Sequence, residues 1–151
     1  MAMAVTYATV GGWLVQENRG GVVSRYVSDT LGSVIQTRDS LGTQTSSAEY
    51  WPFGEVRTQT GSNPSPWGFA GALGYFADTL ARFYVRARIL RVDLARWLTV
   101  DLLWPSELAY AYVGDSPISY SDSSGLGCGG GPDGCPDPCP LRENRDLGAT
   151  Y

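Results

Sequence analysis

The amino-terminal third of the chain alternates between short β-prone runs and turn residues. A Gly-Gly pair at residues 11–12 interrupts the first run, and Gly or Asp residues separate the later ones. Short strands divided by turn signals are typical of antiparallel hairpins, so we expect a mainly β fold. The runs, rich in Val, Thr and Tyr, occupy residues 4–16, 22–27, 33–38 and 43–50.

Two of the turns share one sequence pattern. Residues 29–32 read DTLG and residues 39–42 read DSLG, so the pattern Asp-x-Leu-Gly recurs with a period of 10 (39 − 29). A strand and a turn that recur at a fixed short period indicate successive hairpins. We therefore expect these hairpins to form an open, curved antiparallel sheet.

Residues 80–98 fit two hydrophobic patterns. As a strand, Phe83 and Val85 share one face while Arg82 and Tyr84 share the other. As a helix, apolar residues recur at steps of three and four, and the segment contains neither Pro nor Gly. The helical stripe would consist of Leu80, Phe83, Ala87, Leu90, Leu94 and Trp97.

Further along the chain the predicted regular structure is sparse. Pro105 is suited to the first turn of a helix, which predicts one short helix near residues 105–112. Residues 118–120 are expected to form a short strand. From residue 127 onward Gly, Pro and Cys dominate, which predicts an irregular tail. We therefore divide the chain into a core domain, residues 1–126, and a Gly/Pro/Cys-rich tail, residues 127–151.

Charge is segregated within the carboxyl-terminal half. Five arginines lie within residues 82–96, whereas residues 101–122 contain four acids and no base. Arginine is the cation best suited to buried, bidentate pairing with carboxylates. Three of the arginines are therefore candidates for a network with those acids: Arg86, Arg88 and Arg96.

A series of motifs occurs along the chain in a characteristic order. They are DTLGS at 29–33, YWPFGE at 50–55, FYVRAR at 83–88, RWLT at 96–99 followed by Asp101, YAYV at 110–113 followed by Ser-Pro, and YSDSSGL at 120–126. With these motifs the chain resembles the core module at the carboxyl-terminal end of Rhs (YD-repeat) proteins, over residues 22–126. The resemblance implies YD-type hairpins in the amino-terminal part and strands, not a helix, over residues 80–98.

The resemblance also implies a candidate chemistry. In the family, two aspartates at the positions of Asp101 and Asp122 form an intramolecular aspartyl protease. The chain is cut after a leucine that corresponds to Leu126, so the bond concerned here joins Leu126 to Gly127. Two close carboxylates can act on a water molecule as base and acid. Here Leu102 and Ser123 replace the prolines that follow both aspartates in the family. The alternative is that both acids are turn residues paired with arginines.

Composition narrows the classes of ligand. A net charge of −4 gives no electrostatic attraction for nucleic acid, and no run approaches the ~20 apolar residues of a membrane span. The chain has no His, which removes the usual acid, base or metal ligand of several reaction classes. We expect no metal and no cofactor, and no small-molecule substrate is evident. Its odd number of cysteines leaves an internal disulfide with a free thiol, an interchain disulfide or three thiols open. They are Cys128, Cys135 and Cys139.

The resemblance implies a structural function. In the family, many repeats wind into a hollow β-shell around a cargo, and the core module plugs its end. A few hairpins cannot close a shell, so they leave an apolar, aromatic sheet face and unpaired edges. We expect an assembly protein that associates with itself, as a filament or other homo-oligomer, or with a larger YD-repeat chain. Family members are often exported, which predicts an extracellular or cell-surface location. The alternative is a self-cleaving protein that releases the tail.

Overall fold

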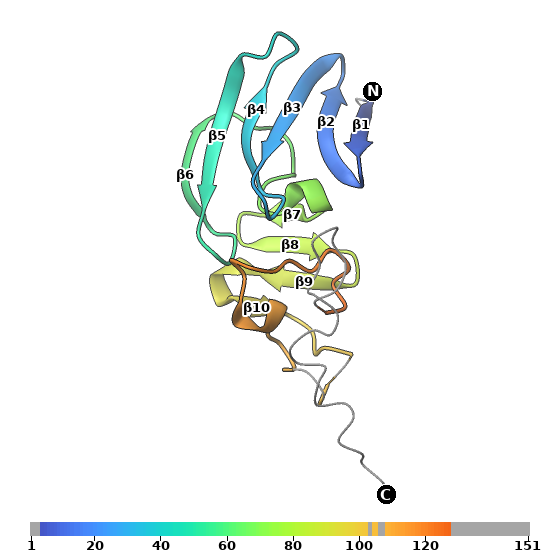
Figure 1. Ribbon diagram of the computed structural model, residues 1–151, viewed down its shortest axis with the longest axis vertical. Coiled ribbons are helices and arrows are strands. Elements are labelled where there is room, and N and C mark those ends of the chain that lie inside the picture. Colours follow the sequence, from blue (N-terminus) through green and yellow to red (C-terminus); the bar gives the residue numbers. More distant parts are fainter. Residues whose placement is uncertain (1–3, 103, 106–107, 128–151) are drawn as a thin grey trace, which may run out of the picture.

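The computed structural model describes residues 4–102, 104–105 and 108–127, which form two antiparallel β-sheets (Figure 1). The larger sheet is a meander in which each strand pairs with its neighbour in sequence. The predicted succession of hairpins in an open sheet is therefore confirmed, with β6 as a strand that the sequence pattern did not indicate. Its strands are β1 (Val5–Val10), β2 (Trp13–Arg19), β3 (Val22–Ser28), β4 (Val34–Arg38), β5 (Gln44–Tyr50) and β6 (Val56–Gly61).

The two Asp-x-Leu-Gly turns have the same geometry. The Asp29 carboxylate accepts hydrogen bonds from the backbone N–H groups two and four residues later, at 2.9 and 2.8 Å. The Asp39 carboxylate accepts the equivalent bonds, at 2.9 and 2.9 Å. The glycine that ends each turn has a positive φ, 84° and 88°, which a residue with a Cβ rarely adopts. The side chain of each aspartate thus builds its own turn, and the ten-residue repeat is a repeat of structure.

Residues 80–98 contain three strands of the smaller sheet and do not form the α-helix of the alternative pattern. The turn between β8 and β9 consists of Arg86 and Ala87, and Arg86 has a φ of 42°. This turn breaks the simple alternation, so that Arg88 begins the next strand with only 5 % of its surface exposed. The sheet has the order β10-β9-β8-β7, formed by β7 (Phe76–Thr79), β8 (Arg82–Val85), β9 (Arg88–Arg91) and β10 (Arg96–Trp97).

The helix predicted near 105–112 is not found in the part of this segment that the structure describes. Residues 105, 109 and 110 lie in turns, and Ala111 forms an isolated bridge with Arg96. The carbonyl groups of Ala109 and Tyr110 accept hydrogen bonds from Asp101 and Trp97, at 2.7 and 2.9 Å, and so serve the neighbouring segment. The strand predicted at 118–120 is also wrong, because residues 118 and 119 form a turn. The residues that the structure describes contain three short 3-10 helices: η1 (Gly71–Leu73), η2 (Val92–Leu94) and η3 (Val113–Asp115).

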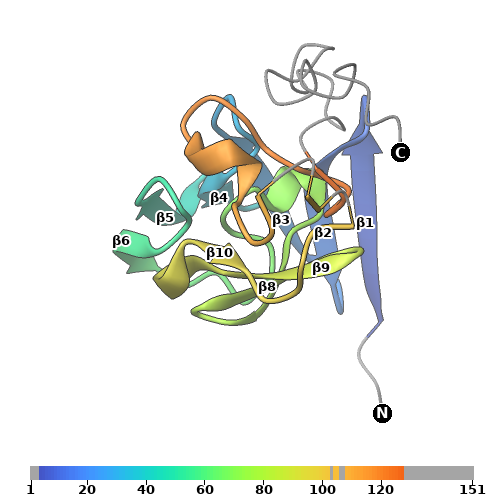
Figure 2. The ribbon, with the colours of Figure 1, turned by 90° about the horizontal axis from the view of Figure 1, so that it is seen from below.

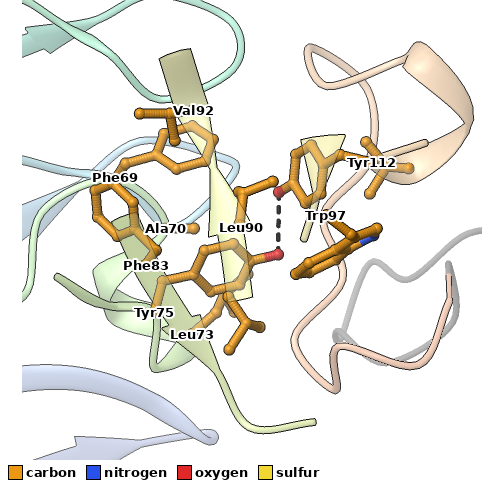
Figure 3. Close-up of a cluster of buried hydrophobic side chains, with 11 residues drawn as sticks. Phe69, Ala70, Leu73, Tyr75, Phe83, Leu90, Val92, Trp97 and Tyr112 are labelled. Atoms are coloured by element: carbon orange, nitrogen blue, oxygen red, sulfur yellow. Dashed lines mark hydrogen bonds between the residues drawn. The ribbon is translucent and has the colours of Figure 1, made fainter. Parts of the chain in front are cut away.

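The main hydrophobic core lies against the smaller sheet and includes residues of the segments before and after that sheet (Figure 3). Phe69 is at its centre, with its ring 6.0 Å from that of Tyr75, 6.1 Å from Phe83 and 6.5 Å from Tyr112. Trp97 packs edge-on against Tyr112 at 5.4 Å. Aromatic packing thus holds the irregular segment of residues 109–127, which has few hydrogen bonds of the kind that pair β-strands.

The buried face of the larger sheet is more polar than the sequence led us to expect. Leu14, Tyr26 and Val34 form an apolar cluster there. The strand register also places buried Thr37 and Ser46 across from each other, with their hydroxyl groups 2.6 Å apart. Each hydroxyl group provides the hydrogen-bond partner that the other needs, so these polar residues are tolerated at buried positions.

A buried carboxylate lies on the same face. Glu17 is 1 % exposed and accepts hydrogen bonds from Arg19 at 2.9 Å, from the Tyr26 hydroxyl at 3.2 Å and from the Ser65 hydroxyl at 3.1 Å. The bond to Glu17 raises the pKa of Arg19 above its ordinary value. Because Ser65 belongs to the loop after β6, this cluster ties that loop to the sheet. We did not single out Glu17 from the sequence.

Candidate functional site

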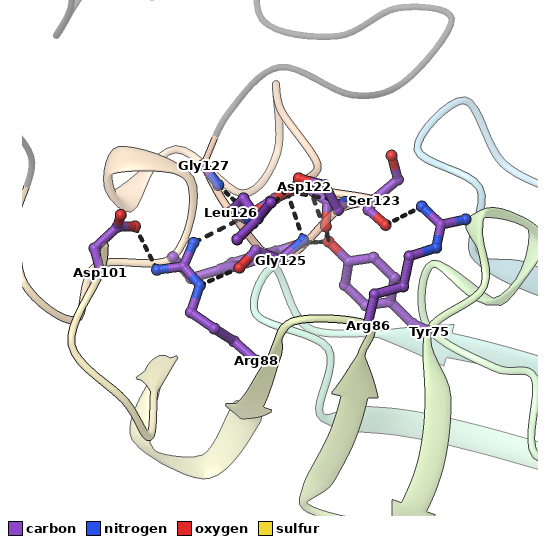
Figure 4. Close-up of polar contacts among 11 residues, drawn as sticks. Tyr75, Arg86, Arg88, Asp101, Asp122, Ser123, Gly125, Leu126 and Gly127 are labelled. Atoms are coloured by element: carbon purple, nitrogen blue, oxygen red, sulfur yellow. Dashed lines mark hydrogen bonds and ion pairs between the residues drawn. The ribbon is translucent and has the colours of Figure 1, made fainter. Parts of the chain in front are cut away.

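Arg88 brings together the two aspartates that the sequence singled out (Figure 4). One terminal nitrogen of its guanidinium group donates to Asp101 Oδ2, and the other lies 3.2 Å from Asp122 Oδ2. The guanidinium also lies over the ring of Trp97, 4.2 Å from its centroid. All three charged side chains are at most 5 % exposed. The acids therefore meet around a shared cation that lies between them.

Asp122 organises the backbone that follows it. Its Oδ1 atom accepts hydrogen bonds from the Ser124 N–H at 3.1 Å, the Ser124 hydroxyl at 2.8 Å and the Gly125 N–H at 2.9 Å. Its Oδ2 atom accepts one from the Gly127 N–H at 2.8 Å. A carboxylate that accepts several backbone bonds fixes a tight turn, so Asp122 determines the path of residues 122–127.

The hairpin turn between β8 and β9 holds this segment from the other side. Arg86 donates to the Ser123 carbonyl, the Ala87 N–H to the Ser124 carbonyl at 3.4 Å, and Arg88 Nε to the Gly125 carbonyl. Three successive residues, 86–88, thus each donate a hydrogen bond to one of three successive carbonyl groups, those of residues 123–125. This close approach brings the two backbones into contact at Gly125.

The remaining predicted site residues are placed as follows. Arg96 is exposed and donates to the Leu94 carbonyl at 3.2 Å, apart from the two aspartates. Leu126 is 47 % exposed, and its N–H donates to the Ser124 hydroxyl at 3.1 Å. The nitrogen of the Leu126–Gly127 peptide bond is the one that lies 2.8 Å from Asp122 Oδ2. The structure therefore places the bond implied by the resemblance directly beside one of the two acids.

Tyr75 is a member of this site that we did not single out from the sequence. Its hydroxyl donates to the Asp122 carbonyl at 2.8 Å and accepts from the Asp122 N–H at 2.9 Å. The Tyr112 hydroxyl lies 3.0 Å away. Burial raises the pKa of both phenols above the ordinary value, so both hydroxyls keep their protons at neutral pH. No charge pattern or spacing marks Tyr75 among the apolar residues around it, whereas Tyr112 belongs to the YAYV motif at 110–113.

The other candidate features are the cysteines, metal ligands and membrane-spanning helices. Cys128, Cys135 and Cys139 lie outside the described residues, as does the rest of the tail after Gly127. Within residues 4–102, 104–105 and 108–127, no three Cys, Asp or Glu side chains are grouped so as to hold a metal ion. In the same residues, no helix has the length and apolar character needed to cross a bilayer.

A groove with a volume of about 610 Å³ runs along the larger sheet. It is bordered by Val5 and Tyr7 of β1, by Val56 and Gln59 of β6, and by the loop of residues 63–66. The Tyr7 ring packs against the Trp67 ring at 5.7 Å. Both outer strands of the sheet therefore border one open surface.

Comparisons with known proteins bear on the fold. No protein-family model and no curated protein matches the chain. Among solved structures, it is similar to the crystal structure of TcdB2-TccC3 (21 % identity, TM-score 0.70) and to TcdB2-TccC3 without the hypervariable C-terminal region (20 %, 0.71). A Tc holotoxin pore of Photorhabdus luminescens is also similar (19 %, 0.68).

Each similarity covers 82 % of this chain but only 6 or 7 % of the other chain. The chain thus corresponds to a small part of the structures that it matches. At about 20 % identity the similarity concerns the arrangement of the backbone alone. The described residues therefore share the fold of the matching parts of these solved structures.

Proposed function

We propose that this chain is a structural assembly module that associates through β-sheet edges, with copies of itself or with a larger YD-repeat chain. The observation that carries the proposal is that the larger sheet is open. Its outer strands β1 and β6 lie on opposite sides of the sheet (Figure 2). Among the described residues, neither has a strand partner on its outer side. An outer strand presents unpaired N–H and C=O groups, which a strand of another chain can bind.

The two edges differ in chemistry. On the β6 side, Arg57 lies 3.8 Å from Glu49, and the Thr58 hydroxyl donates to the same carboxylate at 2.8 Å. Strand β1 reads VTYATV and has no charged residue, although every position after Val5 is exposed. Charged side chains on an edge oppose pairing with further strands. We therefore assign association to β1 in the first place.

The solved structures with this fold support a partnered state. Two of them are named as TcdB2-TccC3 and one as a holotoxin pore, and this chain matches only 6 or 7 % of each. In a chain many times longer than this one, a few hairpins would be flanked by further structure at both edges of their sheet. The exposed β1 strand and the groove beside it are the surfaces that such a neighbour would cover.

Replacing Thr6 by lysine in β1 is expected to weaken association. The new charge would lie on the exposed edge and oppose pairing with another strand. We expect the wild-type chain to have a mass above 16.3 kDa in size-exclusion chromatography with light scattering, and Thr6→Lys to raise the dissociation constant about tenfold or more. Thr58→Lys on the already charged β6 edge is the matched control and should change little. A wild-type chain that stays monomeric at all concentrations would contradict self-association.

A second candidate function is self-cleavage after Leu126. The observation in its favour is the distance of 2.8 Å between Asp122 Oδ2 and the Gly127 nitrogen. Hydrolysis requires a water molecule to add to the Leu126 carbonyl carbon and a proton to reach the Gly127 nitrogen as the C–N bond breaks. In the structure Asp122 Oδ2 accepts a hydrogen bond from the Gly127 N–H, so Asp122 must first gain a proton, as in a carboxylate pair that shares one, before it can supply a proton to the Gly127 nitrogen. Asp101, on the other side of Arg88, would take the proton of the water. The competing role of these residues is a purely structural ion-pair cluster.

Intact-mass analysis of the purified chain separates the two roles. If the aspartates cleave the chain, a species that ends at Leu126 should accumulate with time, and Asp122→Asn should remain whole because the proton donor is lost. Asp115→Asn, at an exposed position, is the control and should be cut at the wild-type rate. A wild-type chain that keeps its full mass after long incubation would exclude self-cleavage and leave the structural role.

A further inference from the structure

Tyr75 holds the main chain of Asp122 by two opposite contacts. Its hydroxyl accepts from the Asp122 N–H at 2.9 Å and donates to the Asp122 carbonyl at 2.8 Å. The side chain is fully buried, 0 % exposed, so water does not compete for these bonds. Because both peptide groups of one residue are fixed, Asp122 cannot rotate about its own backbone without breaking a buried hydrogen bond.

Tyr112 completes the arrangement. A phenol hydroxyl group has one hydrogen, and that of Tyr75 is directed at the Asp122 carbonyl. The contact of 3.0 Å between the two hydroxyls therefore has Tyr112 as the donor. Tyr112 supports Tyr75, but only Tyr75 touches Asp122 in these hydrogen bonds.

We propose that Tyr75 is a positioning residue that sets the place of the Asp122 carboxyl group opposite the Gly127 nitrogen. The proposal rests on the self-cleavage candidate. The carboxyl group is joined through Cβ to the backbone that Tyr75 fixes, and its Oδ2 atom lies 2.8 Å from the Gly127 nitrogen. A small rotation of residue 122 would carry Oδ2 away from that nitrogen. Beside the bonds that the carboxylate itself accepts, the hydroxyl of Tyr75, and not its ring, opposes this rotation from the backbone side.

The test compares two variants that each lose one buried hydroxyl. Tyr75→Phe removes both contacts with Asp122, and Tyr112→Phe removes only the support from the second phenol. We expect the rate of cleavage after Leu126 to fall about tenfold to a hundredfold in Tyr75→Phe, since displacement of a reacting group by about 1 Å has effects of this size. The rate in Tyr112→Phe should stay within about threefold of wild type, by the same argument.

Hydrogen exchange provides a readout that does not require cleavage. In Tyr75→Phe, the amides of Asp122 and Gly125 should lose protection, while those of β8 and β9 keep it. A Tyr75→Phe chain with wild-type protection at Asp122 and Gly125 would overturn the proposal, whether or not the wild type is cut. Equal rate losses in both variants, with protection lost throughout the smaller sheet, would also overturn it and indicate a role in packing. If the wild-type chain is never cut, self-cleavage is excluded, and the position of Asp122 then has no catalytic role.

Discussion

Replacing Arg88 by alanine is expected to lower the free energy of unfolding by about 3–5 kcal/mol, which is typical when one partner of a buried ion pair is removed. The guanidinium group bonds to Asp101, to Asp122 and to the Gly125 carbonyl, and all of these lie in the interior. Without it, two buried carboxylates would lose their shared cation. Urea denaturation followed by circular dichroism measures the change.

Arg96→Ala is the matched control. Arg96 is exposed and donates only to the Leu94 carbonyl in the bonds that the structure shows, so its loss should cost within about 0.5 kcal/mol, as for most surface substitutions. A loss of less than about 1 kcal/mol in Arg88→Ala would contradict the buried ion-pair cluster, because charges left unpaired in the interior cost more than this.

Gly125→Ala is expected to have the second large effect. Gly125 has a φ of 69°, and a Cβ atom there would meet the Val85 carbonyl oxygen inside normal contact distance and lie 3.1 Å from the Arg88 nitrogen. A left-handed residue costs about 1–2 kcal/mol and overpacking about 1–3 kcal/mol, so we expect a total of about 2–5 kcal/mol. Thermal unfolding of the two chains measures it.

Gly42→Ala separates the two contributions. Its φ of 88° is also positive, but no atom lies within 4 Å of the position that a Cβ would take. The cost there should therefore be the backbone part alone, about 1–2 kcal/mol. Equal costs at both positions would show that residues 122–127 do not pack against the β8–β9 turn as described.

The fold could be predicted from local patterns wherever a turn carries its own chemistry. Asp29 and Asp39 each build a turn with their own side chain, so the sequence contains all the information needed for these hairpins. For residues 80–98, hydrophobic periodicity left helix and strand open. The resemblance favoured strands, and the structure agrees. The turn at Arg86 was missed, because a positive φ of 42° at an arginine has no local signal.

The failures lie where distant segments decide the conformation. The expected helix near 105–112 does not form in its described residues: residues 109 and 110 lie in turns, and their carbonyl groups accept hydrogen bonds from the N–H groups of Asp101 and Trp97, which precede the predicted helix in the sequence. The segregation of charge indicated that arginines and acids would meet, but not that Arg88 would lie between the aspartates while Arg96 faces solvent. Tyr75 carries no sequence signal, since its partner is the backbone of Asp122 and not a side chain.

The ten-residue repeat has a consequence for how such a chain can change its size. The Asp29 and Asp39 turns join β3 to β4 and β4 to β5, so one repeat is one strand and reverses the direction of the chain. Insertion or deletion of a single unit would deliver the following residues to the wrong end of the sheet, whereas a gain or loss of two units restores the original course. Growth by duplication should therefore proceed in blocks of about twenty residues, each widening the sheet by about 9–10 Å at the usual strand spacing.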